Sequence, residues 1–150
     1  MSGILWWNIA DGWPQISDAV VDWYGCKKIA YYYIKRSQTP FCMMFDEPVD
    51  GKLTLVAAND TQSAVHASYT VTDLTTGATV TKGNLEIEAN GCIRVEQVPE
   101  AKNGFYMITW ESDAGSGRNH FTCTIGDGWT WDAYRACMQK AGFYDKYEGF

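Results

Sequence analysis

The sequence predicts a mainly β protein: an immunoglobulin-like antiparallel β-sandwich, preceded by a strand and a helix and followed by a short helix. Three observations predict this fold class. Short segments of alternating character follow one another between about residues 41 and 125, turn-forming residues separate them, and helical spacing of apolar residues occurs before and after them. We therefore expect two domains, residues 1–40 and residues 41–150.

The N-terminal segment predicts a buried strand followed by a helix. Residues 3–9 are apolar and rich in aromatic side chains, as in a buried strand. A polar stretch with a proline follows, and residues 19–24 form a second apolar patch. Residues 26–36 predict a helix with one apolar face, and Lys35 and Arg36 lie where they favour the negative end of the helix dipole.

Strands with a period of two are predicted throughout the middle of the chain. Residues 52–57 and 65–71 show the alternation of a half-buried strand. Further strands are predicted at residues 78–80, 85–89, 92–95, 105–111 and 119–124. The turn signals are Asn59-Asp60, Thr76-Gly77, Lys82-Gly83-Asn84, Asn90-Gly91, Asn103-Gly104 and Gly115-Ser116-Gly117. Many short strands at close spacing favour a sandwich of the immunoglobulin-like type.

A second helix is predicted after residue 127. Its apolar side chains recur at three- and four-residue steps, at Trp131, Tyr134, Met138 and Ala141. Gly142 suits the C-cap, where a left-handed backbone is common. The aromatic tail, residues 143–150, is expected to pack on a neighbouring surface.

Composition narrows the classes of partner. The 150 residues carry a formal net charge of −6 without a basic patch, so we expect no nucleic-acid partner. No apolar run approaches the roughly 20 residues that span a bilayer, so we expect no membrane partner. The five cysteines are widely spaced and form no C-x-x-C pair, so we expect no metal and no cofactor. Free thiols are typical of a reducing compartment, which favours a cytoplasmic location.

Residues with catalytic chemistry are scarce. His66 and His120 lie in predicted strands without a nucleophile motif nearby, and we expect both to be structural or surface residues. Of the carboxylates, Asp22 is predicted to belong to a turn or a helix entry. Asp11 lies among tryptophans just beyond the first predicted strand. Those tryptophans pack in a core or present an indole face to a sugar ring, and composition leaves both interpretations open.

Three stretches of the first forty residues carry a family resemblance. WNIADGWP (residues 7–14), DWYG (22–25) and KIAYYYIKR (28–36) closely resemble the end of the catalytic (β/α)8 barrel of family 2 glycoside hydrolases, on the β-mannosidase and exo-β-glucosaminidase side. VTDLTTG (71–77) and RNHF (118–121) resemble strands of that family's C-terminal sandwich. The resemblance implies that the first domain is the last strand and helix of the barrel, and that the second is the immunoglobulin-like domain with its helix.

The resemblance also implies an activity and a site. The family hydrolyses terminal β-linked sugars with retention, using two glutamates in motifs of the N-E and S-E-[FY]-G kind, and neither motif occurs here. We therefore expect no catalytic residue in this chain, an accessory sandwich, and no activity in isolation. By position, Trp7, Asp11 and Trp13 match the wall of the sugar pocket and are predicted to bind substrate. Ala10 and Asp18 depart from the family pattern, so the sugar is left open.

Two structural expectations follow for the tryptophan-rich segment. The family's tryptophan at the position of Trp7 often precedes a non-proline cis peptide bond. Because such a bond is unfavourable unless surrounding contacts hold it, and most of the barrel is missing, we expect the Trp7-Asn8 bond to be trans. We also expect the segment to pack on the sandwich or to form a homodimer, since exposed aromatic surface favours association.

Three functional hypotheses remain. The first is a C-terminal fragment of a retaining glycosidase, with a β-linked glycoside and the rest of the barrel as its partners. The alternative is a free-standing carbohydrate-binding or adhesion module whose exposed tryptophans bind glycans. The third is a piece of a split gene with no function of its own.

Overall fold

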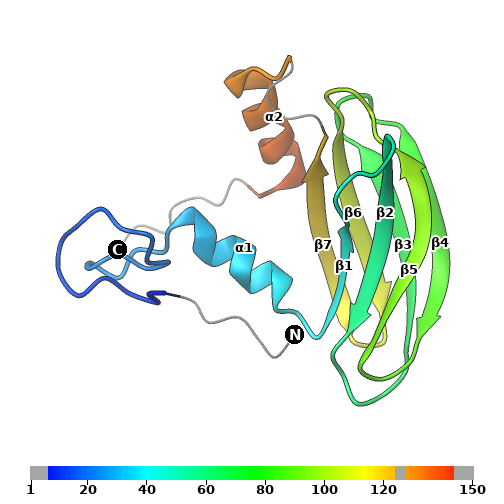
Figure 1. Ribbon diagram of the computed structural model, residues 1–150, viewed down its shortest axis with the longest axis horizontal. Helices are drawn as coiled ribbons and strands as arrows, with labels where there is room; N and C mark the ends of the chain where they lie inside the picture. The colour runs from blue at the N-terminus through cyan, green and yellow to red at the C-terminus, as the bar shows by residue number, and fades with distance from the viewer. Residues whose placement is uncertain (1–6, 124–127, 144–150) are drawn as a thin grey trace. The chain divides into compact units, whose positions relative to one another are not determined.

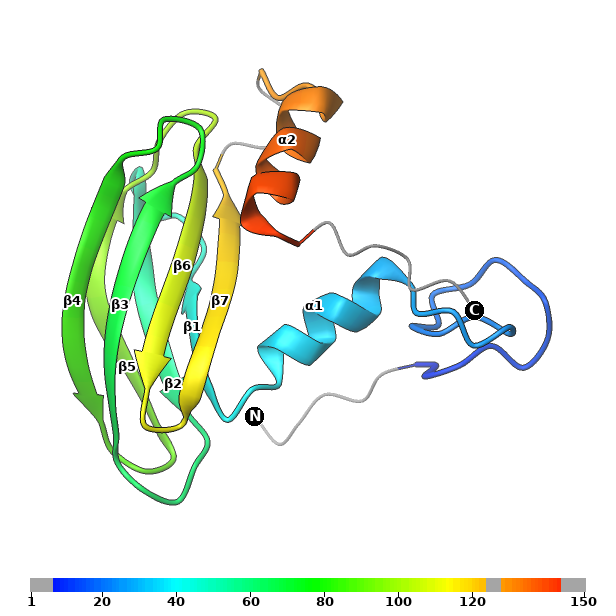
Figure 2. The same ribbon diagram turned by 180° about the vertical axis from the view of Figure 1, so that it is seen from behind.

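Two antiparallel β-sheets pack face to face in Thr39–Tyr144, one of two units into which the chain divides. The computed structural model describes residues 7–123 and 128–143. One sheet has the strand order β1-β2-β5 and the other the order β4-β3-β6-β7 (Figures 1 and 2). The strands are β1 (Phe41–Phe45), β2 (Lys52–Asn59), β3 (Val65–Asp73), β4 (Thr79–Ile87), β5 (Gly91–Pro99), β6 (Phe105–Ser112) and β7 (Gly115–Thr122). Within the described residues, seven strands in two antiparallel sheets form a mainly β sandwich, so the predicted fold class is confirmed.

Alternation along the strands builds the core between the sheets. In β2 every second residue is buried, and Leu53, Leu55 and Ala57 are fully enclosed. The same period holds in β3, where Val65 and Val71 face inward. The segments predicted to alternate therefore contribute one face each to the core, as the period of a pleated strand requires.

Two glycines that resemble turn signals lie inside strands instead. The turn predicted at Lys82-Gly83-Asn84 is wrong, because Gly83 pairs with Tyr69 in the middle of one continuous strand, β4. A Cβ on Gly83 would lie 2.8 Å from the Tyr69 hydroxyl oxygen. On β7, a Cβ on Gly117 would lie 2.3 Å from Cζ2 of Trp110. Both glycines therefore make room for an aromatic ring of the neighbouring strand.

A β-bulge directs one carboxylate from the first sheet toward the second. Leu55 pairs with Glu96 and Val56 pairs with Arg94, so Val95 is the extra residue of β5. Val95 packs against the core, and the next residue, Glu96, also faces the opposite sheet. Its Oε1 accepts hydrogen bonds from the hydroxyls of Tyr69, at 2.5 Å, and Thr81, at 2.8 Å. Burial, with Glu96 as the next cause, raises the pKa of Tyr69 to about 12.

The second predicted helix is confirmed as α2 (Trp131–Ala141). The Thr130 hydroxyl accepts a hydrogen bond from the Ala133 amide at its start, and Gly142 adopts the left-handed C-cap conformation with φ 65°. Met138 and Ala141 are buried as the spacing predicts, whereas Trp131 is 66% exposed. The apolar face of the helix thus begins one turn later than expected.

Arg118 of β7 attaches α2 to the sandwich. Its guanidinium donates hydrogen bonds to the carbonyl oxygens of Ala141 and Gly142, each at 3.0 Å. The same group lies over the ring of Phe143, which is buried. Figure 1 shows α2 beside β7, at the edge of the sheet. The remainder of the predicted aromatic tail, residues 144–150, lies outside the described residues.

The other unit, within Met1–Gln38, contains the helix α1 (Ile29–Ser37). This helix begins three residues later than predicted, because Lys28 has an extended backbone at the N-cap. Most of the strand predicted at residues 3–9 lies outside the described residues, and residues 7–9 are not strand. Among the described residues, no helix combines the length and apolarity needed to cross a membrane.

The prediction for the Trp7-Asn8 peptide bond is wrong, because this bond is cis. The expectation treated the missing barrel as the main support of the segment. Instead, backbone hydrogen bonds within the unit hold the residues that follow: the amides of Val20 and Val21 donate to the carbonyl oxygens of Asn8 and Ile9, at 3.3 and 3.0 Å.

Candidate functional site

The predicted site residues lie on a loop, residues 7–28, that backbone hydrogen bonds close at its base. Val21 forms a parallel bridge with Ala10 and an antiparallel bridge with Lys27, so three segments meet at this residue. The Asp11 amide donates to the Val21 carbonyl oxygen at 3.1 Å, and the Lys28 amide donates to the Val20 carbonyl oxygen at 2.9 Å. The loop is therefore held by main-chain contacts at both ends.

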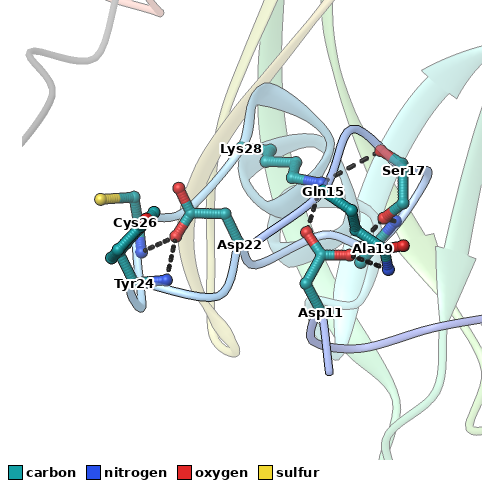
Figure 3. A network of polar contacts seen from close by, with 8 residues as sticks. All are labelled: Asp11, Gln15, Ser17, Ala19, Asp22, Tyr24, Cys26 and Lys28. Carbon is teal, nitrogen blue, oxygen red and sulfur yellow. Dashed lines mark hydrogen bonds and ion pairs between the residues drawn. The ribbon is translucent and has the colours of Figure 1, made fainter. Parts of the chain in front are cut away.

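The Asp11 carboxylate is the centre of a polar network inside this loop (Figure 3). Its side chain is fully enclosed, and Lys28 Nζ lies 3.1 Å from Oδ2. Oδ1 accepts hydrogen bonds from Gln15 Nε2, at 3.1 Å, and from the Ser17 hydroxyl. Lys28 Nζ also donates to the Ser17 carbonyl oxygen at 3.0 Å. Both carboxylate oxygens are thus satisfied within the loop.

Electrostatics favour the ionised form of Asp11. The hydrogen bond from Ser17 is the largest influence and lowers its pKa, while desolvation opposes it and the contacts with Lys28 and Gln15 lower it further. The net pKa lies below the usual aspartate value. Asp11 is therefore a charged group paired with Lys28, and a hydrogen-bond donor of a ligand would have to displace one of its present partners.

Asp22 lies in a turn, as predicted. Its Oδ1 accepts hydrogen bonds from the amides of Tyr24, at 2.9 Å, and Cys26, at 2.8 Å. The Asp22 amide in turn donates to the Cys26 carbonyl oxygen at 2.9 Å. These contacts make Asp22 an Asx-turn residue that leads the chain toward α1.

The two predicted indoles are largely exposed, unlike the enclosed carboxylate. Trp7 is 80% exposed and Trp13 is 64% exposed, so neither packs in a core within the described residues. Asp11 lies between them in sequence but is directed inward. The structure therefore places all three residues on one loop and gives them different environments. Trp6, the other tryptophan of this cluster, lies outside the described residues.

No protein-family model matches the chain, and no curated protein sequence matches it. Among solved structures, a β-D-mannosidase from Dictyoglomus thermophilum matches 78% of this chain with a TM-score of 0.65 and 22% identity. An exo-chitosanase from Amycolatopsis orientalis matches 84% of it with a TM-score of 0.56 and 20% identity. The chain therefore shares the fold of the corresponding parts of these two structures.

The chain corresponds to a small part of the proteins that it matches. The chain spans 15% of the β-mannosidase and 16% of the exo-chitosanase. The N-terminal loop and helix, residues 7–38, contain no glutamate, and the glutamates of the described residues all lie in the sandwich unit.

Three residues around Asp11 were not singled out by sequence reasoning. Gln15 and Ser17 follow Asp11 within one loop, but their role depends on how the loop folds back. Lys28 lies 17 residues further along the chain, at the start of the aromatic helix. The only available signal was that a lysine opens this helix in the family pattern, which identifies the residue without identifying its partner.

A second cluster of polar side chains lies on the outer face of the four-stranded sheet. An open cavity of about 640 Å³ is bordered by strands β3, β4 and β6 and includes His66, Glu86, Glu111 and Asp113. His66 Nδ1 lies 3.0 Å from an Asp113 oxygen, and this contact lowers the pKa of Asp113. The imidazole is 64% exposed, as expected for a surface histidine. Among the described residues, no three potential ligand side chains are grouped to hold a metal.

Proposed function

We propose that this chain is the C-terminal portion of a retaining glycoside hydrolase that acts on terminal β-linked sugars. Its sandwich is an accessory domain, and the chain alone is inactive. The observation that supports this proposal best is the fold match to the β-mannosidase over 78% of the chain, together with the WNIADGWP stretch of residues 7–14. Retaining hydrolysis requires two carboxyl groups about 5 Å apart, and a longer polypeptide supplies them.

The distribution of apolar side chains supports a barrel partner. Ten large apolar side chains of the described residues are exposed, and eight of them belong to residues 7–38. Helix α1 buries none of its residues within the described structure. A surface of this kind is typical of a segment that packs against further protein. We assign that role to the remaining strands and helices of the barrel.

Within the assembled barrel, the loop of residues 7–28 forms one wall of the sugar pocket. The exposed faces of Trp7 and Trp13 pack on the apolar C–H face of a pyranose. Asp11 belongs to the same wall, and we propose it as the third substrate-binding residue, although in this structure its carboxylate is paired with Lys28. Carboxyl ends of barrel strands carry the substrate-binding loops in this architecture, which is the position proposed for this loop.

Two measurements test the proposal. The DNA upstream of the Met1 codon is expected to encode strand–helix units that include the N-E and S-E-[FY]-G motifs, and an unrelated gene at that position would contradict it. Purified chain is expected to release no nitrophenol from nitrophenyl β-mannoside, β-glucosaminide or β-galactoside. Hydrolysis by this chain alone would show that its catalytic groups are present after all.

The alternative function, a carbohydrate-binding module, is favoured by one observation: Trp7 and Trp13 are available to solvent. Titration with mannan, chitosan and galactoside oligomers would then change tryptophan fluorescence, and a Trp7→Ala/Trp13→Ala double variant would lose the response. No response to any of the three oligomers removes this alternative.

Self-association and location are further parts of the proposal. In the absence of the barrel, the exposed apolar side chains of residues 7–38 favour a homodimer, which sedimentation at increasing concentration would detect. A cytoplasmic location is supported by the free state of all five cysteines. Fractionation of the source cells tests this location directly.

A further inference from the structure

The strongest unassigned feature of the N-terminal unit is the way Lys28 connects two parts of it. Its amide donates to the Val20 carbonyl oxygen at the base of the loop, and its side chain reaches Asp11 and the Ser17 carbonyl oxygen. Lys28 is also the N-cap residue of α1, where its ammonium group cannot accept hydrogen bonds from the free amides of the first turn. The ammonium group instead donates to groups of the loop, at Asp11 and at the Ser17 carbonyl oxygen (Figure 3).

The partner of Lys28 is a carboxylate without access to solvent. The Asp11 side chain is 0% exposed and that of Lys28 is 29% exposed. An enclosed carboxylate that loses its counter-charge is disfavoured, because the cost of its desolvation is then no longer offset by the ion pair. Among the described residues, Lys28 is the cation that forms an ion pair with Asp11. Lys28 therefore balances the charge at the centre of a loop whose base is closed by main-chain hydrogen bonds.

The same loop determines where the exposed indoles lie. Trp13 follows Asp11 by two residues, and Trp7 precedes it by four. Both side chains are largely exposed, so packing within the described residues does little to orient them. Their positions are set by the backbone, and the carboxylate of Asp11 adds a side-chain connection to the start of α1 beside the main-chain bonds at the base of the loop.

We propose that Lys28 is a positioning residue: through its ion pair with Asp11 it fixes the loop of residues 7–28 and thereby places the indoles of Trp7 and Trp13 as a sugar-binding platform. The platform itself rests on the proposed function. The positioning by Lys28 does not, because it concerns the conformation of this chain without a ligand. Lys28 contacts no substrate in this scheme, and Ser17 and Gln15 support it by occupying the other carboxylate oxygen.

Fluorine NMR of the whole chain labelled with 5-fluorotryptophan tests the proposal. Each of the seven tryptophans gives one signal, assigned by single Trp→Phe variants. In Lys28→Met, the signals of Trp7 and Trp13 are expected to shift by more than their line widths. Lys28→Arg restores the charge and is expected to return both signals to their original positions. Lys35→Met, which removes an exposed lysine of the same helix, serves as the matched control and leaves them in place.

Trp23 separates positioning from general unfolding. It lies in the turn held by Asp22, outside the Asp11 network, and its signal is expected to stay in place in Lys28→Met. Unchanged Trp7 and Trp13 signals would overturn the proposal. Collapse of the Trp23 signal together with theirs would also overturn it, because Lys28 would then be needed for folding of the whole unit. Failure of Lys28→Arg to restore the signals would do the same, by removing the ion pair as the cause.

The readout requires neither sugar nor barrel. If the chain shows no relation to a glycosidase, the fluorine signals still decide the role of Lys28. Conversely, a negative result here leaves the nitrophenyl glycoside and upstream-sequence tests of the proposed function unaffected.

Discussion

The two units of this chain distribute their apolar side chains in opposite ways. In Thr39–Tyr144 the large apolar side chains are enclosed between two sheets and around α2. In the described part of Met1–Gln38, Ala19 is the one buried apolar residue, the Asp11 carboxylate is enclosed, and indoles face solvent. The sandwich buries most of its own large apolar side chains. The N-terminal unit is held mainly by polar contacts and leaves its large apolar side chains exposed to solvent. The difference shows which unit is self-sufficient and which is suited to a partner.

Substitution of one tryptophan in each unit is expected to give the largest difference in the free energy of unfolding. Trp110 is 4% exposed and packs edge-to-face against Phe41, so Trp110→Ala is expected to lower the free energy of unfolding by about 3–5 kcal/mol. Trp13→Ala removes a 64% exposed indole and is expected to change it by less than about 0.5 kcal/mol. Urea denaturation followed by circular dichroism measures both. Equal losses would contradict the division between the units.

Two glycine-to-alanine substitutions, each of which adds one methyl group, test the same difference in packing between the units. Gly117→Ala introduces a Cβ 2.3 Å from the Trp110 ring and is expected to cost about 1–3 kcal/mol as the ring or strand moves. Gly12→Ala places its Cβ in open space, with no heavy atom within 4 Å, and is expected to be nearly neutral. Thermal unfolding of the two variants measures the effect. A neutral Gly117→Ala would mean that the sandwich is packed more loosely than the structure indicates.

A smaller loss of stability is expected when Arg118, which binds the end of α2 to the sandwich, is replaced. Arg118→Met removes the hydrogen bonds to the carbonyl oxygens of Ala141 and Gly142 and is expected to cost about 1 kcal/mol. Hydrogen exchange of the α2 amides should accelerate accordingly. Arg94→Met, on the exposed face of β5, is the control and should leave this exchange unchanged. Protection that survives in Arg118→Met would show that Met138 and its apolar neighbours suffice to hold the helix.

The smallest effect is a pH dependence of the sandwich. Burial raises the pKa of Asp73, but hydrogen bonds from Thr75, Phe105 and Thr76 outweigh it, so the net pKa lies below the usual value. A lowered folded-state pKa stabilises the protein above about pH 4, and this contribution is lost as the pH falls through the folded-state pKa. Asp73→Asn should therefore flatten the fall of the thermal midpoint between pH 5 and 2.5.

Asp113 supplies the matched control for this measurement. Its pKa is also lowered, chiefly by His66, but its side chain is 67% exposed on the β6–β7 hairpin. Asp113→Asn is expected to alter the pH profile less than Asp73→Asn does. The reverse order would show that the buried hydrogen bonds of Asp73 contribute little.

The sandwich was predictable from the sequence because its signals are local. Alternation in β2 and β3 depends on neighbouring residues, and the C-cap glycine, Gly142, follows directly after its helix. The error at Gly83 arose because a glycine beside a lysine and an asparagine is typical of a turn. Its actual role depends on the ring of Tyr69, which a different strand contributes.

The N-terminal unit was predictable only in part, because its decisive contacts join residues that lie far apart in the sequence. The sequence indicated Trp7, Asp11 and Trp13 as a group, and the resemblance placed them on one segment. It did not reveal that Asp11 is enclosed, because the lysine that pairs with it lies 17 residues away. The cis bond after Trp7 was likewise missed, since the backbone contacts that hold its neighbours come from Val20 and Val21.

The contacts of Glu96 affect how the two sheets resist sliding past each other. Its carboxylate belongs to β5 of one sheet and accepts hydrogen bonds from β3 and β4 of the other. Sliding of one layer past the other would break both bonds at once, and would leave a partly enclosed charge without its donors. Force applied along the strands therefore meets resistance from this cross-link as well as from the apolar side chains packed between the sheets. We therefore expect the two sheets to move together, without sliding, when force is applied along the strands.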